Sequence, residues 1–154
     1  MSKRPSPSRA DPTSESEALE HALRALRFRE RSTSEVDRYL AARGIDEADR
    51  HAALETLGRT SLVDDRRFAD TRASSLAGRG GGDDLIRHEL ARAGVADELI
   101  DGAIASLPAE IRRAEGIVER RGASSKTARY LAAKGFSEDV VHAVIADSRA
   151  EPLG

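Results

Sequence analysis

The sequence predicts an all-α protein, a tandem array of three three-helix repeats. A ten-residue pattern occurs three times without gaps, at 36–45, 86–95 and 127–136. Each copy ends in a glycine followed by an apolar residue, as at Gly44, which is a typical helix stop. Apolar residues also recur with helical spacing, and no segment alternates as a β-strand would. Repeats of this period build arrays of small units that bury apolar faces against one another, so we expect an elongated, curved molecule.

The chain length agrees with three modules and two short tails. A chain of 154 residues has room for three units of about 45 residues in a row. The N-terminal segment carries prolines among serines and charged residues, cannot bury apolar surface, and is predicted to be disordered. The last residues are predicted to form a frayed tail. The predicted limits of the N-terminal tail, the three repeats and the C-terminal tail are 1–14, 15–60, 61–107, 108–149 and 150–154.

Local signals indicate where individual helices begin and end. Ser32 and Glu35 form a capping box, in which the serine hydroxyl accepts from the Glu35 amide. Asp46 and Asp64 are suitable N-caps for the next two helices. The glycine run 78–82 is predicted to be a flexible loop, because glycine costs about 1 kcal/mol per residue inside a helix. The expected helices cover about 18–26, 32–43, 46–57, 64–76, 84–93, 97–107, 108–121, 125–134 and 138–149.

Composition excludes several classes of protein. There are no cysteines, so disulfides, thiolate metal sites and cysteine nucleophiles are excluded. No window approaches the roughly 18 apolar residues of a membrane span, and the polar N-terminus lacks the apolar core of a signal peptide. A cytoplasmic protein is therefore expected. The formal net charge of −2 argues against indiscriminate nucleic-acid binding.

The sequence offers little support for catalysis. The pair His88-Glu89 lacks the second histidine of a zinc helix, and Arg92 stands where that ligand would be. The glycines at 80–82 lack the Lys-Ser/Thr of a phosphate-binding loop. His51 and His142 occupy equivalent positions in two repeats, as expected of surface residues. We expect a protein that is not an enzyme and holds no cofactor or metal.

Several strings of residues resemble the bacterial RecX family. They are Arg29-Glu30-Arg31-Ser32, Leu62-Val63-Asp64-Asp65 with Arg67-Phe68-Ala69, and Gly135-Phe136-Ser137. Their order and spacing are specific, and the resemblance extends from about Glu17 to Ala146. It implies a crescent of three-helix repeats that binds RecA–single-stranded DNA filaments. It also implies that the protein modulates, mainly inhibits, ATP hydrolysis and strand exchange in recombination and DNA repair.

Two other functions compete with this interpretation. One is a single-stranded nucleic-acid-binding helical module that acts without direct contact with RecA. The other is a helical scaffold for a different protein partner. An operator-reading helix-turn-helix protein is disfavoured, because the third helix of each repeat begins with acidic residues that phosphates repel. A monomer is expected, with at most weak direct contact with DNA.

The residues that carry the resemblance are interpreted mainly as structural. Ser32 and Glu35 form a cap, Asp64 forms another, and Phe68 is expected in the core. Arg67 either pairs with a carboxylate or stays solvated. The full structural signature is Ser32, Glu35, Gly44, Asp64, Asp65, Arg67, Phe68, Gly94, Gly135 and Phe136.

The binding surface is sought among exposed cations on the first and second helices of the repeats. The segment from Arg112 to Lys134 contains seven cations and two carboxylates, and the segment from Arg24 to Arg43 contains six cations and three carboxylates. Such clusters have two interpretations. They form a basic face that binds phosphates or acidic patches on a protein, or they belong to an ordinary solvated surface. The candidate residues are Arg24, Arg27, Arg29, Arg31, Arg38, Arg43, Arg79, Arg87, Arg113, Arg120, Arg121, Lys126, Arg129 and Lys134.

Overall fold

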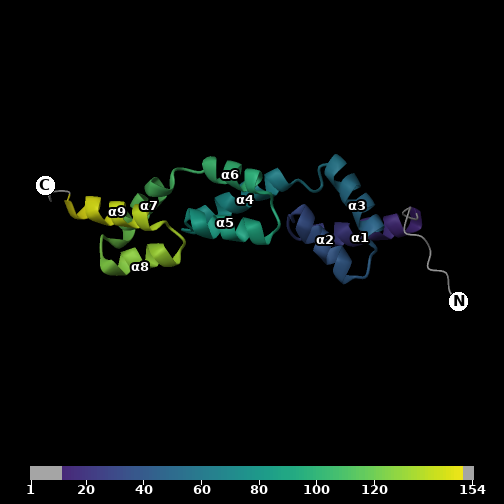
Figure 1. Ribbon diagram of the computed structural model, residues 1–154, viewed down its shortest axis with the longest axis horizontal. Coiled ribbons are helices and arrows are strands. Elements are labelled where there is room, and N and C mark those ends of the chain that lie inside the picture. Colours follow the sequence, from purple (N-terminus) through teal and green to yellow (C-terminus); the bar gives the residue numbers. More distant parts are fainter. Residues whose placement is uncertain (1–11, 151–154) are drawn as a thin grey trace. The chain divides into compact units, whose positions relative to one another are not determined.

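The computed structural model describes residues 12–150, and all regular secondary structure in that range is α-helical (Figure 1). The predicted all-α class is therefore confirmed for the described residues. The helices are α1 (Pro12–Leu26), α2 (Thr33–Ala42), α3 (Glu47–Arg59), α4 (Asp65–Gly78), α5 (Asp83–Arg92), α6 (Asp97–Ala105), α7 (Glu110–Arg121), α8 (Ser125–Ala133) and α9 (Glu138–Ala150).

The helices fall into two compact units. The first unit runs to Phe68 and the second begins at Ala69, so the division lies within α4. The predicted limits of the three repeats stay predictions. Most of the two predicted tails lies outside the described residues. Residues 12–14, expected to be disordered, instead form the first turn of α1, and Ala150 ends α9.

The first unit is held together by a small aliphatic core shared by α1, α2 and α3. Val36 and Leu40 of α2 and Leu57 of α3 are almost completely buried there. Ala18 and Ala22 of α1 are also buried, and their small side chains allow the helices to pack closely. The core is thin because the helices are short and each buries only one stripe of apolar residues.

The predicted helix signals are largely confirmed. Both hydrogen bonds of the Ser32–Glu35 capping box are present at the start of α2. The three repeat glycines all have positive φ, 76° at Gly44, 77° at Gly94 and 90° at Gly135, which glycine adopts without strain. Asp46 precedes α3 as expected, but its side chain makes no capping hydrogen bond.

The second unit contains α5 packed on α6 and a three-helix group formed by α7, α8 and α9. The core of that group includes Ile117 and Val118 of α7, Leu131 of α8, and Val144 of α9. Phe136, in the turn between α8 and α9, closes this core. Figure 1 shows α7 and α9 side by side, with α8 lying across from them.

The predicted glycine loop is present between α4 and α5, but it is packed against the fold and shows no sign of a hinge. Helix α4 continues through Gly78, and Gly81 and Gly82 are buried. The Gly82 amide donates to the Lys134 carbonyl at 2.8 Å, and the Asp84 amide donates to the Gly135 carbonyl at 3.1 Å. The glycines are needed here for close approach of two backbones rather than for mobility.

Candidate interaction surface

Two strings that are far apart in the sequence bind each other in the first unit. The Thr33 amide and hydroxyl donate to one oxygen of Asp65, at 2.7 and 3.0 Å. The Arg67 guanidinium donates to the Glu30 carboxylate and also to the Ser61 carbonyl. The hydrogen bond with Glu30 raises the pKa of Arg67. Arg67 therefore pairs with a carboxylate, one of the two predicted outcomes, and these residues clamp the start of α2 to the start of α4.

The remaining signature residues also have structural roles. Asp64 accepts from the Arg67 amide at 3.1 Å, as an N-cap should. Phe68 and Phe136 are only 5% and 4% exposed. Ser32 is completely buried beneath its capping box. Each of these contacts agrees with the prediction that the signature residues are mainly structural.

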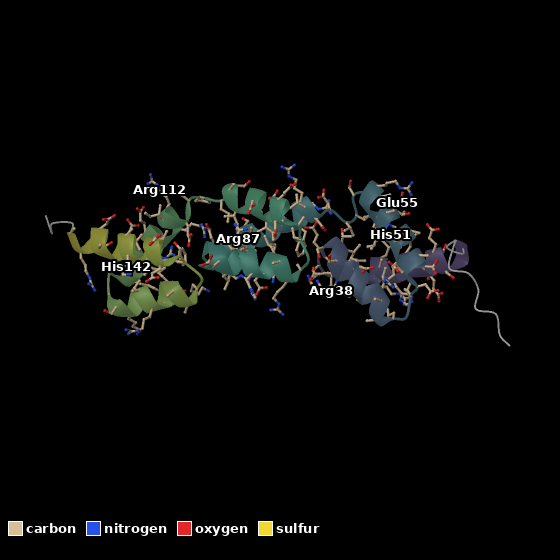
Figure 2. The ribbon with its side chains drawn as sticks, in the orientation of Figure 1. Arg38, His51, Glu55, Arg87, Arg112 and His142 are labelled. Atoms are coloured by element: carbon tan, nitrogen blue, oxygen red, sulfur yellow. The ribbon has the colours of Figure 1, made fainter. Side chains whose placement is uncertain are left out.

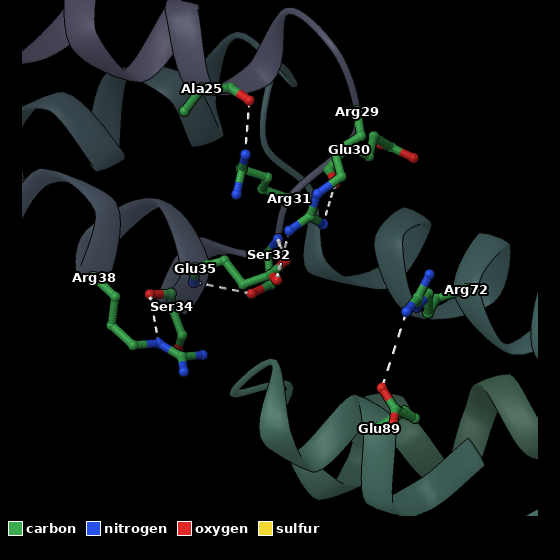
Figure 3. Close-up of polar contacts among 10 residues, drawn as sticks. All are labelled: Ala25, Arg29, Glu30, Arg31, Ser32, Ser34, Glu35, Arg38, Arg72 and Glu89. Carbon is green, nitrogen blue, oxygen red and sulfur yellow. Dashed lines mark hydrogen bonds and ion pairs between the residues drawn. The ribbon is translucent and has the colours of Figure 1, made fainter. Parts of the chain in front are cut away.

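The loop between α1 and α2 is held from several directions (Figure 3). The Arg31 guanidinium donates to the Ala25 carbonyl at 2.7 Å, which closes the end of α1. Arg29 pairs with Glu35 at 3.2 Å and donates to the Glu30 carbonyl. Several polar groups of the loop thus bind groups of α1, α2 and the loop itself.

A partly buried ionic cluster supports the contact between the α4–α5 loop and the α7–α9 group. Arg113 of α7 pairs with Asp83, donates to the Gly81 carbonyl at 2.8 Å, and lies 5.9 Å from the Phe136 ring centroid. Only 11% of the Arg113 side chain is exposed. Arg113 therefore takes part in packing within the second unit, which leaves little of its side chain to reach a partner.

Glu110 lies in the same cluster. Its carboxylate accepts from the Ser137 amide at 2.8 Å. Burial raises the pKa of Glu110, and the neighbouring carboxylate of Asp83 raises it further. Two carboxylates beside one arginine leave Glu110 without full compensation for its charge.

Seven of the fourteen predicted cations are engaged within the fold. Two of them stack on tyrosines at equivalent repeat positions: Arg43 lies 3.5 Å from the Tyr39 ring centroid, and Arg121 lies 3.5 Å from that of Tyr130. Arg87 pairs with Asp101 at 2.7 Å. The engaged cations are Arg29, Arg31, Arg38, Arg43, Arg87, Arg113 and Arg121.

Six other predicted cations are exposed and form no ion pair with a described residue. They are Arg24, Arg27, Arg79, Arg120, Lys126 and Arg129. Lys134 is half-buried and, with Arg79, lines a pocket of about 330 Å³ in the second unit. The other residues that line this pocket are Arg72, Leu76, Leu85 and Glu89. That these cations meet a partner stays a prediction.

Phe28 is a surface residue that the sequence reasoning missed. Its side chain is 88% exposed, whereas Leu62, Leu23 and Ile111, the other exposed large apolar residues in the described range, reach at most 49%. The available signal was a phenylalanine between two arginines in a segment without helical periodicity.

The described residues contain no group of three or more histidine, cysteine or acidic side chains that could hold a metal ion. His51 on α3 and His142 on α9 are both exposed, as their equivalent repeat positions predict (Figure 2). Asp49 of α3 is a buried carboxylate with one oxygen that has no hydrogen-bond partner. Across residues 12–150, the helices are too short or too polar to cross a membrane.

Comparison with known proteins identifies two of the helical groups. The sequence model of the RecX first three-helix domain matches residues 18–57, and that of the RecX second three-helix domain matches residues 64–104. The regulatory protein RecX of Halorhodospira halophila is 34% identical over 135 residues, which cover 81% of this chain and 84% of the relative. The regulatory protein RecX of Mycolicibacterium vanbaalenii is 33% identical, covering 94% and 95% of the two chains.

Solved structures show the same fold. The crystal structure of RecX from Lactobacillus salivarius has a TM-score of 0.76, with coverage of 90% of this chain and 99% of the other. A second crystal structure, of regulatory protein RecX, has a TM-score of 0.70 and covers 85% and 71%. Sequence identity is 21% in both cases, so this likeness concerns the fold alone.

Proposed function

The chain belongs to the RecX family of regulatory proteins, and from this premise we propose that it regulates the RecA recombinase, mainly by inhibition. In this proposal the protein binds RecA filaments on single-stranded DNA. It thereby reduces ATP hydrolysis and strand exchange during recombination and DNA repair. The observation that carries the proposal is the similarity over most of the chain to relatives named as regulatory proteins.

The distribution of cations supports action through binding. Arg120, Lys126 and Arg129 project from α7 and α8 into solvent and form no ion pair with a described residue. At the end of α1, Arg24 and Arg27 are also exposed and form no ion pair with a described residue. Exposed cations that form no ion pair with a described residue are available to contact acidic patches on a protein or phosphates of DNA.

A repeat protein offers a physical route from binding to inhibition. A filament presents identical protomers at regular intervals, and a chain of repeated helical groups presents several separate contact surfaces. Contacts with more than one protomer would make the second contact effectively intramolecular and would oppose relative movement of the protomers during ATP turnover. The protein needs no catalytic group for this action.

The decisive experiment is a titration of the single-stranded-DNA-dependent ATPase of the cognate RecA. Strong suppression is expected at well below one molecule of this protein per RecA, because one bound molecule affects neighbouring protomers. A nucleic-acid-binding module that acted only by covering DNA would need amounts that saturate the strand. Suppression seen only near that saturation, or no suppression at all, would contradict the proposal.

A companion measurement separates filament binding from binding to free RecA. Sedimentation of RecA filaments, formed on single-stranded DNA with a non-hydrolysable nucleotide, is expected to carry this protein into the pellet. RecA without DNA and nucleotide serves as the control and should retain little of it. Binding to free RecA alone would contradict the proposed mechanism.

A further inference from the structure

The α1–α2 loop exposes its single aromatic side chain, while Glu30 and Arg31 of the same loop bind other parts of the first unit. Phe28 is 88% exposed, and its neighbours Arg27 and Arg29 are exposed as well. Burying a phenylalanine is worth about 1.5–3 kcal/mol, so a ring left in water forgoes that stabilisation. The other two phenylalanines of the chain are buried.

The ring is presented by a fixed support. Arg31 of the loop donates to the Ala25 carbonyl, and the Glu35 carboxylate accepts from Arg29 and from the Ser32 amide (Figure 3). Glu30 is bound by Arg67 from the start of α4. A surface that is held in place before binding loses little conformational entropy on binding.

The loop and the end of α1 hold two cations that form no ion pair with a described residue. The two nearby carboxylates, Glu30 and Glu35, already accept from arginines of the fold. Arg24 and Arg27 are exposed and make no ion pair with any described residue. Of the two arginines that flank Phe28 in the sequence, Arg29 pairs with Glu35, whereas Arg27 forms no ion pair with a described residue.

We propose that the loop around Phe28 is a binding site for single-stranded nucleic acid, in which the ring stacks on an unpaired base while Arg24 and Arg27 contact phosphates. An aromatic ring beside a basic surface is the combination that such sites use, and stacking accepts any base. A protein partner fits less well. The central part of a protein interface groups several apolar residues and is depleted of charge, whereas the loop presents one ring among arginines.

Binding is tested without RecA, so the result is independent of the proposed function. The probes are a thymidine 12-mer and a 12-mer of the same length with abasic sugars, which keeps the phosphates and removes the bases. Phe28→Ala is expected to weaken binding of the thymidine strand by about fivefold or more. The same variant should bind the abasic strand as the original protein does. Because Phe28 is exposed, the variant is expected to keep its helical circular dichroism.

A direct readout comes from Phe28→Trp, which introduces the only tryptophan into a chain that has none. Its fluorescence should be quenched by the thymidine strand and not by the abasic strand. The variant with Arg24→Gln and Arg27→Gln should reduce the slope of log affinity against log salt by about 1.4, or about 0.7 per cation. A uridine 12-mer shows whether RNA is bound at the same site.

The site would be refuted by either of two results. One is equal affinity of Phe28→Ala and the original protein for the thymidine strand. The other is an equal loss of affinity for the thymidine and abasic strands, because stacking then plays no part. If Phe28→Ala binds DNA normally but suppresses the RecA ATPase less, the ring contacts protein, and the nucleic-acid assignment is wrong.

Discussion

The backbone of Gly82 packs directly against the backbone of Gly135. A Cβ atom on Gly82 would lie 2.4 Å from the carbonyl carbon and oxygen of Gly135. The Lys134 carbonyl beside it accepts from the Gly82 amide at 2.8 Å. The α4–α5 loop and the α8–α9 turn are thus joined main chain to main chain, with no room for a side chain between them.

Substitution of Gly82 by alanine is expected to destabilise the second unit by about 2 kcal/mol or more, because the added methyl group meets rigid backbone. The φ of Gly82 is −84°, which alanine adopts easily, so the cost is steric alone. Urea unfolding followed by circular dichroism measures the change. Gly102→Ala is the matched control: nothing lies within 4 Å of its added Cβ, so it should stabilise α6 by up to about 1 kcal/mol. Equal stability of the two variants would contradict the packing argument.

Substitution of Asp65 by alanine is expected to lower the free energy of unfolding by about 1–3 kcal/mol. The change removes the acceptor of two hydrogen bonds from Thr33 and leaves its amide unsatisfied at the start of α2. Urea unfolding measures this loss. Asp70→Ala, an exposed position on the same helix, should change stability by no more than about 0.5 kcal/mol. If Asp65→Ala behaves like Asp70→Ala, the clamp between α2 and α4 contributes little to folding.

Substitution of Glu110 by glutamine is expected to stabilise the protein at neutral pH and to have less effect in acid. The folded pKa of Glu110 is raised, so its contribution to stability is present below the ordinary glutamate pKa of about 4.5 and is lost as pH rises through the folded pKa. Glutamine still accepts from the Ser137 amide and carries no charge beside Asp83. Unfolding measured at pH 4 and pH 7 should show the advantage of the variant growing with pH.

A suitable control for this pH series is Glu115→Gln, on an exposed position of α7. Its effect on stability should be small and similar at both pH values. An advantage of Glu110→Gln that is the same at pH 4 and pH 7 would show that packing, rather than ionisation, explains it.

Reversal of charge at Lys126 and Arg129 is expected to weaken suppression of the RecA ATPase. Both residues project from α8 and pair with no described residue, so their replacement by glutamate leaves the fold intact. Two reversed charges at a contact surface should raise the concentration needed for half-suppression by about tenfold or more. Lys126→Arg with Arg129→Lys keeps the charge and should act as the original protein does. Undiminished suppression by the glutamate variant would exclude α8 from the contact surface.

Local sequence signals were sufficient for most of the secondary structure. The capping box at Ser32 and the stop at Gly44 depend on residues only a few positions apart, and both are present in the structure. The family strings around Glu30 and Asp65 were also recognisable in sequence. That these two strings bind each other was not, because they are more than thirty residues apart and only packing brings them together.

The candidate surface was less predictable than the fold. The sequence shows Arg113 and Lys126 as equivalent members of one basic cluster, yet Arg113 is buried against Asp83 and Lys126 is solvated. Whether a cation forms an ion pair within the protein depends on whether the fold places a carboxylate beside it. The exposure of Phe28 also depends on the tertiary structure, since the other two phenylalanines of the chain are buried.

The amino-acid sequence by itself determined the helices, their order, the repeated glycine stops and the family, because these depend on short-range pattern and on residue identity. The tertiary structure alone decided that Gly82 forms a tight backbone contact rather than a hinge, and that Phe28 faces water. Both are consequences of steric fit and of pairing between distant residues. Neither can be predicted from the helix propensity of the local sequence.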